Sequence, residues 1–114
     1  MGRRFAKRLT GLLLVAAMLA MPASAQEASG GREFTVTMDN MVFGRVPADA
    51  KVGDTIIWVN NDTVQHTATA RDNSFDVRLQ PGKRARTVLS KAGNVAVYCI
   101  YHPMMRTTLK VVAS

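Results

Sequence analysis

Residues 95–105 read Val-Ala-Val-Tyr-Cys-Ile-Tyr-His-Pro-Met-Met, a strand pattern that runs directly into a loop rich in metal-binding side chains. The β-branched and aromatic residues of Val95–Tyr98 predict a strand. The loop begins with Cys99, the one cysteine of the chain, followed by His102 three residues later and Met105 three after that. Thiolate, imidazole and thioether are ligands that suit copper in both of its common oxidation states. The spacing therefore predicts that one loop wraps one metal ion.

A fourth ligand is expected from His66, the only other histidine in the sequence. Two histidines, one cysteine and one weak axial methionine make the ligand set of a blue-copper electron-transfer site. In this hypothesis Cys99 is the dominant donor, His66 and His102 complete a trigonal plane, and Met105 is the long axial ligand. Met104 competes with Met105 for the axial role, and the spacing favours Met105. We therefore expect one type 1 copper ion held by His66, Cys99, His102 and Met105.

The first 25 residues have the pattern of a secretory signal peptide. A basic head that begins with Arg3-Arg4 precedes an apolar run over 12–21, and Ala23-Ser24-Ala25 supplies a small-x-small cleavage pattern. A membrane anchor is the alternative, but ten apolar residues are fewer than the about 20 that a span needs. Arg3-Arg4 fits twin-arginine export and the rest of that motif is imperfect, so Sec and Tat export both remain open. We expect export to the periplasm and no membrane span in the mature form.

The charge of the mature chain is expected to be mild. Four of the 15 Lys and Arg residues lie in the first 25 positions and none of the 8 acidic residues does, which leaves 11 basic against 8 acidic residues, a net charge of +3. Lys and Arg are scattered with few aromatics between them, so the basic stripe typical of nucleic-acid binding is not present. A weakly positive surface suits an acidic redox partner. We expect a monomer.

The part of the chain after residue 32 is predicted to be all-β. Residues 26–32 are polar and rich in Gly and Ser and are expected to form a flexible N-terminal lead, and 33–114 to form one domain. No segment of this domain has a sustained 3.6-residue apolar period, and short extended segments alternate with turn residues. The predicted strands are 33–38, 41–43, 55–60, 66–70, 75–77, 84–89, 95–98 and 107–112. This pattern predicts a Greek-key β-sandwich of about seven to eight strands, with the four ligands at one end.

Three segments together carry a resemblance to a known family. Residues 52–62 read Val-Gly-Asp-Thr-Ile-Ile-Trp-Val-Asn-Asn-Asp, His66-Thr67 follows, and residues 98–105 read Tyr-Cys-x-x-His-Pro-x-Met. With them the chain resembles the cupredoxins, the type 1 blue copper proteins, and among these most closely the amicyanins, over residues 34–112. The resemblance implies a cupredoxin-like copper-binding domain in 33–114 and periplasmic one-electron transfer. It also implies redox partners: a quinone-cofactor amine dehydrogenase as donor and a c-type cytochrome as acceptor.

Thr67 departs from the amicyanin pattern. Amicyanins carry Asn just after the first histidine ligand, where it ties the two ligand loops together. In this chain the tie is expected to be weaker or to be made by the Thr67 hydroxyl.

Other functions fit these residues less well than electron transfer does. A lone cysteine is often a buried small hydrophobe, but the neighbouring histidine and methionine favour a ligand. A periplasmic copper carrier or storage protein without redox shuttling is the alternative function, although carriers favour open, Met-rich sites. Zinc accepts these ligands except the thioether. An enzyme is not expected, because four protein ligands leave no open position for a substrate. Met41, Pro47, Pro103 and Met104 are predicted to form an apolar docking patch around His102.

Overall fold

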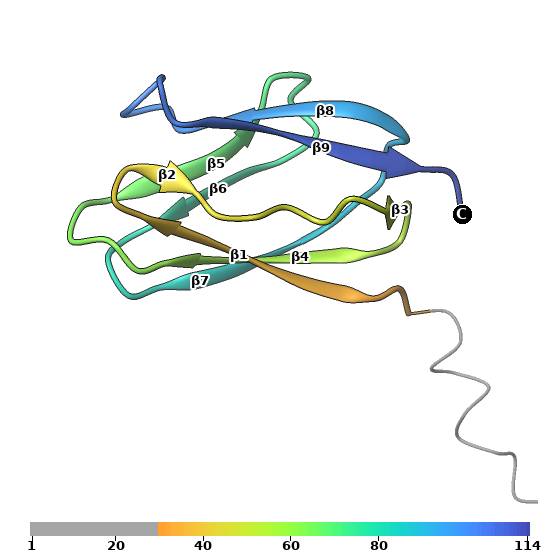
Figure 1. The fold of residues 1–114 in the computed structure, drawn as a ribbon, viewed down its shortest axis with the longest axis horizontal. Helices are drawn as coiled ribbons and strands as arrows, with labels where there is room; N and C mark the ends of the chain where they lie inside the picture. The colour runs from red at the N-terminus through yellow and green to blue at the C-terminus, as the bar shows by residue number, and fades with distance from the viewer. Residues whose placement is uncertain (1–29) are drawn as a thin grey trace, which may run out of the picture.

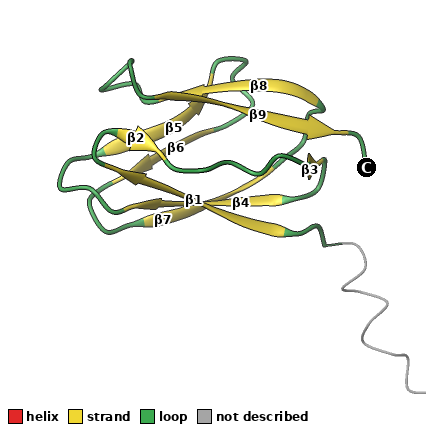
Figure 2. Cartoon of the chain, in the orientation of Figure 1, coloured by secondary structure: helices red, strands yellow, loops and turns green. Residues whose placement is uncertain are grey.

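The computed structural model describes residues 30–114; the predicted signal peptide and residues 26–29 lie outside the described residues. Within 30–114 the secondary structure consists of strands and loops only (Figures 1 and 2). The strands are β1 (Glu33–Asp39), β2 (Val42–Phe43), β3 (Ala50–Lys51), β4 (Thr55–Asn60), β5 (His66–Ala70), β6 (Asp76–Leu79), β7 (Arg84–Val88), β8 (Gly93–Tyr98) and β9 (Arg106–Val112). The described part of the chain contains no helix of the length and hydropathy that a membrane span requires.

The nine strands form two sheets that face one another. One sheet has the strand order β2-β1-β4-β7 and the other β3-β9-β8-β5-β6 (Figure 1). The prediction of an all-β Greek-key sandwich is confirmed. The structure has nine strands where seven or eight were expected, because the two-residue strand Ala50–Lys51 pairs in parallel with β9 at Val111 and Val112. That segment carries no alternating pattern, and the sequence indicated only a turn there.

Alternating residues of the facing strands fill the core between the sheets. β1 contributes Val36 and Met38, and β4 contributes Ile56 and Trp58, all fully buried. This is the inward face expected from the period of two in a strand. The indole Nε1–H of Trp58 donates a hydrogen bond of 3.0 Å to the Thr87 hydroxyl. The one polar atom of this large side chain is therefore satisfied inside the core.

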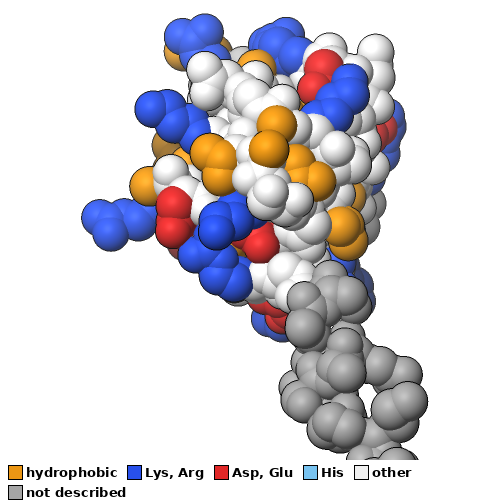
Figure 3. All heavy atoms as spheres, turned by 90° about the vertical axis from the view of Figure 1, so that its right-hand side faces the viewer, with side chains coloured by type: hydrophobic (Ala, Val, Ile, Leu, Met, Phe, Trp, Pro, Cys, Tyr) orange, Lys and Arg blue, Asp and Glu red, His pale blue; other side chains and the backbone are white. Residues whose placement is uncertain are grey.

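The loops that carry the predicted ligands lie at one end of the sandwich. The β1–β2 turn, the β4–β5 loop and the β8–β9 loop all lie at the left in Figure 1, and the C-terminus lies at the right. The pairings Glu33 with Thr55 and Lys51 with Val112 place the start of β1 and the end of β9 at the remote end. Figure 3 looks onto that remote end, where Lys and Arg side chains lie scattered among acidic and apolar ones. The domain therefore separates its predicted metal-binding end from the start of β1 and from the C-terminus.

Asp54 anchors the remote end through a buried carboxylate. Its oxygens accept hydrogen bonds of 2.8 Å from the backbone amides of Arg32 and Lys51, and the Arg32 guanidinium lies 3.4 Å away. Burial raises the pKa of Asp54, but the two amide bonds and the charge of Arg32 outweigh it, so the pKa lies below its ordinary value. Arg32, the last residue of the predicted lead, also bonds to Asp49. The carboxylate thus joins the start of β1 to the β3–β4 turn.

Candidate metal centre

The loop Cys99–Met105 joins β8 to β9 and closes on itself. The Cys99 amide donates a hydrogen bond of 3.0 Å to the Met105 carbonyl, and the Met105 amide donates one of 2.8 Å to the His102 carbonyl. Tyr98 and Arg106 pair across the base of the loop. Cys99 and Met105 are buried, His102 is half-buried, and the neighbouring Met104 is 95% exposed. The two predicted sulfur ligands therefore point inward from a loop whose backbone is fixed.

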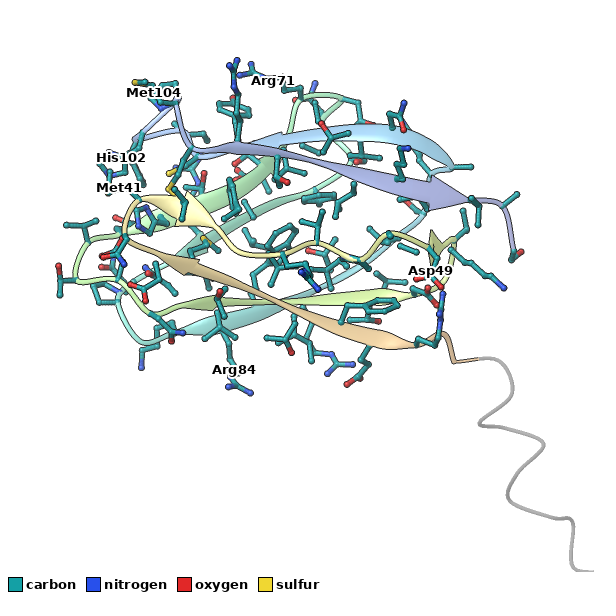
Figure 4. All side chains as sticks on the ribbon, viewed as in Figure 1. Met41, Asp49, Arg71, Arg84, His102 and Met104 are labelled. Atoms are coloured by element: carbon teal, nitrogen blue, oxygen red, sulfur yellow. The ribbon has the colours of Figure 1, made fainter. Side chains whose placement is uncertain are left out.

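His66 reaches the same place from the other ligand loop. It is the first residue of β5, and its side chain is fully buried. Its Nδ1 lies 3.8 Å from the Cys99 sulfur, although 33 positions separate the two residues. The His66 and His102 rings lie 5.3 Å apart between centroids and cross at 73°. The structure thus brings the two predicted histidines and the cysteine to one end of the sandwich, where Figure 4 labels His102.

Asp62 fixes the orientation of the His66 ring. Its Oδ2 lies 2.9 Å from His66 Nε2 and also accepts a hydrogen bond of 3.0 Å from the Met41 amide. The bond to His66 is the main cause that lowers the pKa of Asp62, with the Met41 amide next. An ionised carboxylate accepts hydrogen bonds only, so Nε2 donates to Asp62, and in the neutral imidazole this leaves the lone pair of Nδ1 facing Cys99. This is the tautomer that metal ligation through Nδ1 requires.

Asn60 supports the loop that delivers Asp62 and His66. Its side chain is fully buried, and its amide group donates to the Val64 and Leu79 carbonyls at 2.9 and 3.0 Å. Its side-chain oxygen accepts a hydrogen bond of 2.9 Å from the Asp62 amide. Residues 60–62 belong to the segment that carries the family resemblance and are predicted to end a strand, but the sequence assigns Asp62 no role beside His66. The signal that points further is an acidic residue four positions before the histidine.

Thr67 ties the two ligand loops together. Its amide donates a hydrogen bond of 3.3 Å to the Cys99 sulfur, and its hydroxyl accepts one of 2.9 Å from the Ile100 amide. The residue lies fully buried between β5 and the start of the Cys99–Met105 loop. Of the two possibilities left open by the sequence, the structure has the tie made by the hydroxyl.

An apolar hollow surrounds the exposed side of His102. Its volume is about 650 Å³, and it is lined by Asn40, Met41, Val42, Tyr101, His102, Pro103, Met104 and Met105. Met41 and Met104 lie near His102 at the same end of the molecule (Figure 4). Pro47, which the sequence predicts to join them, instead lines a separate hollow with Phe34 and Arg45. The patch is therefore built from the β1–β2 turn and the β8–β9 loop.

Met41 holds its place in this patch at a conformational cost. Asn40 and Met41 form the two-residue turn between β1 and β2, and both have positive φ, 50° and 64°. Asn tolerates this left-handed region, whereas an unbranched apolar residue rarely adopts it. The hydrogen bond from the Met41 amide to Asp62 helps to hold the turn. The strained residue is thus bonded to the same carboxylate that orients His66.

The donor set can be tested for its fit to a metal ion. An ion about 2.0–2.1 Å from an imidazole nitrogen and about 2.3 Å from a thiolate keeps those two atoms no more than about 4.4 Å apart. The 3.8 Å between His66 Nδ1 and Cys99 Sγ meets that condition. Within residues 30–114, no three His, Cys, Asp or Glu side chains are already gathered as a metal-binding group. The separation of His66 Nδ1 and Cys99 Sγ is therefore compatible with a metal ion between them, and His102 and the thioether of Met105 are the further ligands that the sequence predicts.

Comparisons with known proteins agree with this architecture. The family model for the cupredoxin-like domain matches residues 11–111. The methylamine utilization protein MauL of Methylorubrum extorquens is 36% identical over 98 residues, which cover 82% of this chain and 81% of that protein. A purple cupredoxin from Nitrosopumilus maritimus superposes with a TM-score of 0.56 at 23% identity, over 70% of this chain and 98% of that one. An oxidized amicyanin variant superposes with a TM-score of 0.59 at 21% identity, over 71% of this chain and 81% of that one.

Proposed function

The chain belongs to the cupredoxin-like family, and on this basis we propose that it is an exported, amicyanin-like electron carrier that cycles one type 1 copper ion between Cu(I) and Cu(II). The proposed ligands are His66, Cys99, His102 and Met105. The observation that carries the proposal is the 3.8 Å between His66 Nδ1 and Cys99 Sγ, with Asp62 holding the proton on the other ring nitrogen. When bound, copper supplies a one-electron redox centre, which these side chains cannot provide alone.

The protein's own contribution is a site with little freedom to rearrange. His66 is fixed by β5 and by Asp62, and Cys99 follows β8 directly and receives the Thr67 amide. A site that moves little is suited to an ion whose two oxidation states prefer different coordination. Because the ligands lie on strand ends and on one closed loop, gaining or losing an electron requires little backbone movement.

The hollow around His102 is the proposed docking surface for redox partners. Met41, Tyr101 and Met104 expose apolar surface beside the half-buried imidazole. A contiguous apolar patch on a small protein marks a binding site more often than a random surface does. A partner seated there approaches the copper through His102. The proposed donor is a quinone-cofactor amine dehydrogenase and the proposed acceptor a c-type cytochrome; the relative named for methylamine utilization supports an amine-oxidising context.

Export completes the proposal. The proposed signal peptide is residues 1–25, the proposed lead 26–32 and the proposed copper-binding domain 33–114, with the periplasm as the working compartment of a monomer. An unpaired thiol is exposed to oxidation in that compartment. Burial of Cys99 and its coordination to copper protect the thiol there.

A copper carrier or storage protein without redox shuttling is the second function considered. Such a protein needs ligands that open to release the ion. Here His66 is fully buried and bonded to Asp62, and the Cys99–Met105 loop is closed by two backbone hydrogen bonds. This geometry favours retention of the ion over delivery. An enzyme is not proposed, because four protein ligands leave no position for a substrate.

Copper loading followed by absorption spectroscopy and voltammetry tests the proposal. We expect the oxidised protein to be intensely blue or violet from thiolate-to-copper charge transfer, and to undergo reversible one-electron reduction. Cys99→Ser should lose the band while the metal-free variant keeps its β-sheet circular dichroism. Ser90→Ala is the control, because the adjacent Leu89 bonds with Gly53 and Asp54 at the remote end of the sandwich. A colourless protein that retains only Cu(I) would support the carrier, and a protein that binds zinc and not copper would overturn both.

A further inference from the structure

A row of polar groups leads away from the metal-binding end along the outer face of β5. Side chains alternate along a strand, and Ala68 and Ala70 belong to the core between the sheets. Thr67 and Thr69 therefore point to the opposite face of the sheet. Asp76 on β6 pairs directly with Thr69, so its side chain shares that outer face. Hydrogen bonds connect these three residues to one another.

The direction of these bonds follows from the chemistry of the groups. Thr69 Oγ1 lies 2.8 Å from Asp76 Oδ1 and 2.9 Å from Thr67 Oγ1. A carboxylate only accepts, so the Thr69 hydroxyl donates to Asp76. Thr67 in turn donates its hydroxyl hydrogen to Thr69 and accepts the bond of 2.9 Å from the Ile100 amide. The chain of donors thus runs from Ile100 through Thr67 and Thr69 to Asp76.

Both hydroxyls are sheltered from water. Thr67 is fully buried and Thr69 is 7% exposed, whereas Asp76, the last acceptor in this series of hydrogen bonds, is exposed to solvent. Arg78 lies 3.3 Å from Asp76 Oδ2, which leaves Oδ1 for Thr69. Bonds to a charged acceptor are stronger than neutral ones, and successive bonds in a chain polarise one another. The negative charge of Asp76 therefore makes the Thr67 oxygen a better acceptor for the Ile100 amide.

We propose that Asp76 is a positioning residue for the copper centre, acting through Thr69 and Thr67 on the peptide that follows Cys99. The inference rests on the proposed function, because it assigns Cys99 to copper. Thr67 bonds to that loop twice, through its amide to the Cys99 sulfur and through its hydroxyl to the Ile100 amide. An anchor at Asp76 fixes the second bond and so fixes the direction in which Cys99 leaves β8.

Two measurable consequences follow from this arrangement. In the metal-free protein, loss of the carboxylate weakens the hold on the Ile100 amide, so its hydrogen exchange should accelerate roughly tenfold, the effect of one net hydrogen bond near the upper end of the usual range. In the copper protein, loss of a negative charge joined to the site favours the added electron, so the reduction potential should rise. The first measurement does not require copper and the second does.

The experiment is a double-mutant cycle on Asp76→Ala and Thr69→Val, followed by hydrogen exchange at Ile100 in the metal-free protein. Asp76→Ala should accelerate exchange in the wild-type background and have no further effect in the Thr69→Val background. Thr69→Ser keeps the hydroxyl and should restore slow exchange. Asp76→Asn keeps an acceptor oxygen and should give a smaller increase. Glu33→Gln is the matched control, because Glu33 is also an exposed carboxylate paired with an arginine and lies on the other sheet.

Each outcome bears on the proposal separately from the copper assignment. Equal acceleration by Asp76→Ala in both backgrounds, or none in the wild type, would overturn the hydrogen-bond chain. If the double-mutant cycle supports the hydrogen-bond series but copper-loaded Asp76→Ala keeps the wild-type reduction potential and absorption spectrum, the role of Asp76 at the metal would be overturned. If Asp76 and Thr69 are coupled in their effect on Ile100 but the protein never takes up copper, the hydrogen-bond series would be supported and the proposed function would be overturned instead.

Discussion

Asp62 Oδ2 and His66 Nε2 lie 2.9 Å apart, so a carboxylate and an imidazole four positions apart in the chain act as one unit. The same oxygen accepts the Met41 amide, which links the orientation of His66 to the β1–β2 turn. Partners of this kind set the tautomer and the basicity of a ligating histidine. The ring of His66 is thereby held with Nδ1 facing Cys99, the orientation that the proposed copper site requires.

Replacing Asp62 should weaken copper binding without removing a ligand. In Asp62→Asn the amide keeps the size of the side chain and loses the charge that holds the proton on Nε2, so we expect copper affinity to fall about 10–100-fold. Competitive titration against a copper chelator measures the change. Asp72→Asn, which removes a carboxylate from the exposed β5–β6 turn, is the control and should leave affinity unchanged. Equal affinities for Asp62→Asn and wild type would mean that burial alone orients His66.

Substitutions of the two adjacent methionines, Met104 and Met105, should have different effects. Met105 is 2% exposed and Met104 is 95% exposed. Met105→Gln should change the absorption spectrum and lower the reduction potential, because a harder axial oxygen favours Cu(II). Met104→Ala should leave both unchanged and slow electron exchange with a partner, because it removes apolar surface from the docking patch. A spectrum that responds to Met104 and not to Met105 would reverse the axial assignment.

Met41→Gly should stabilise the domain and impair its proposed docking at the same time. A non-glycine residue in the left-handed region costs about 1–2 kcal/mol, and an Asn-Gly pair suits this two-residue turn. We expect the free energy of unfolding in urea to rise by about 1 kcal/mol, while stopped-flow electron exchange with a redox partner becomes slower. Asn73→Gly, in the β5–β6 turn and outside the hollow, is the control; because Asn tolerates its positive φ of 65°, the gain should be smaller and exchange unaffected. A destabilised Met41→Gly protein would show that the thioether contributes more packing than the turn costs.

Asp54 should make the domain sensitive to acid. Its pKa is lowered in the folded state, so its contribution to stability is present above its ordinary value of 3.8 and is lost as the pH falls through the folded value. Asp54→Asn should cost about 2 kcal/mol at neutral pH, the scale of hydrogen bonds to a charged group. The difference from wild type should shrink below pH 4 in urea unfolding curves. Asp49 is the exposed ion-pair partner of the same arginine, Arg32, so Asp49→Asn should change the free energy of unfolding little at any pH.

Much of the fold and the ligand arrangement could be predicted because their signals are local. Alternation in 33–38 and the β-branched and aromatic residues of 55–60 indicated the strands that bury Val36 and Trp58, and the Cys-x-x-His-x-x-Met spacing needs only one loop. The position of His66 beside Cys99 followed once each was placed at a strand end. The assignment of these side chains to copper remains a prediction until metal is added.

The unpredicted features depend on contacts between distant segments. The parallel pairing of β1 with β4 joins residues 22 positions apart, such as Glu33 and Thr55, and nothing in either strand specifies it. Asp62 has the sequence context of an ordinary turn residue, and its role appears only when the loop folds it onto His66. The same is true of Asp76, whose link to the Cys99–Met105 loop passes through two other side chains. Residues joined by hydrogen bonds of this kind do not form a periodic pattern in the sequence, so the sequence does not predict these bonds.

The separation of the C-terminus from the His102 face has a practical use. Val112 finishes β9 at the end of the sandwich opposite the patch. A tether fixed at Ser114 to an electrode or bead would thus leave the imidazole edge turned toward the solution. Such an orientation would let incoming proteins reach the copper unhindered, whereas attachment through Tyr101 or Met104 would block it.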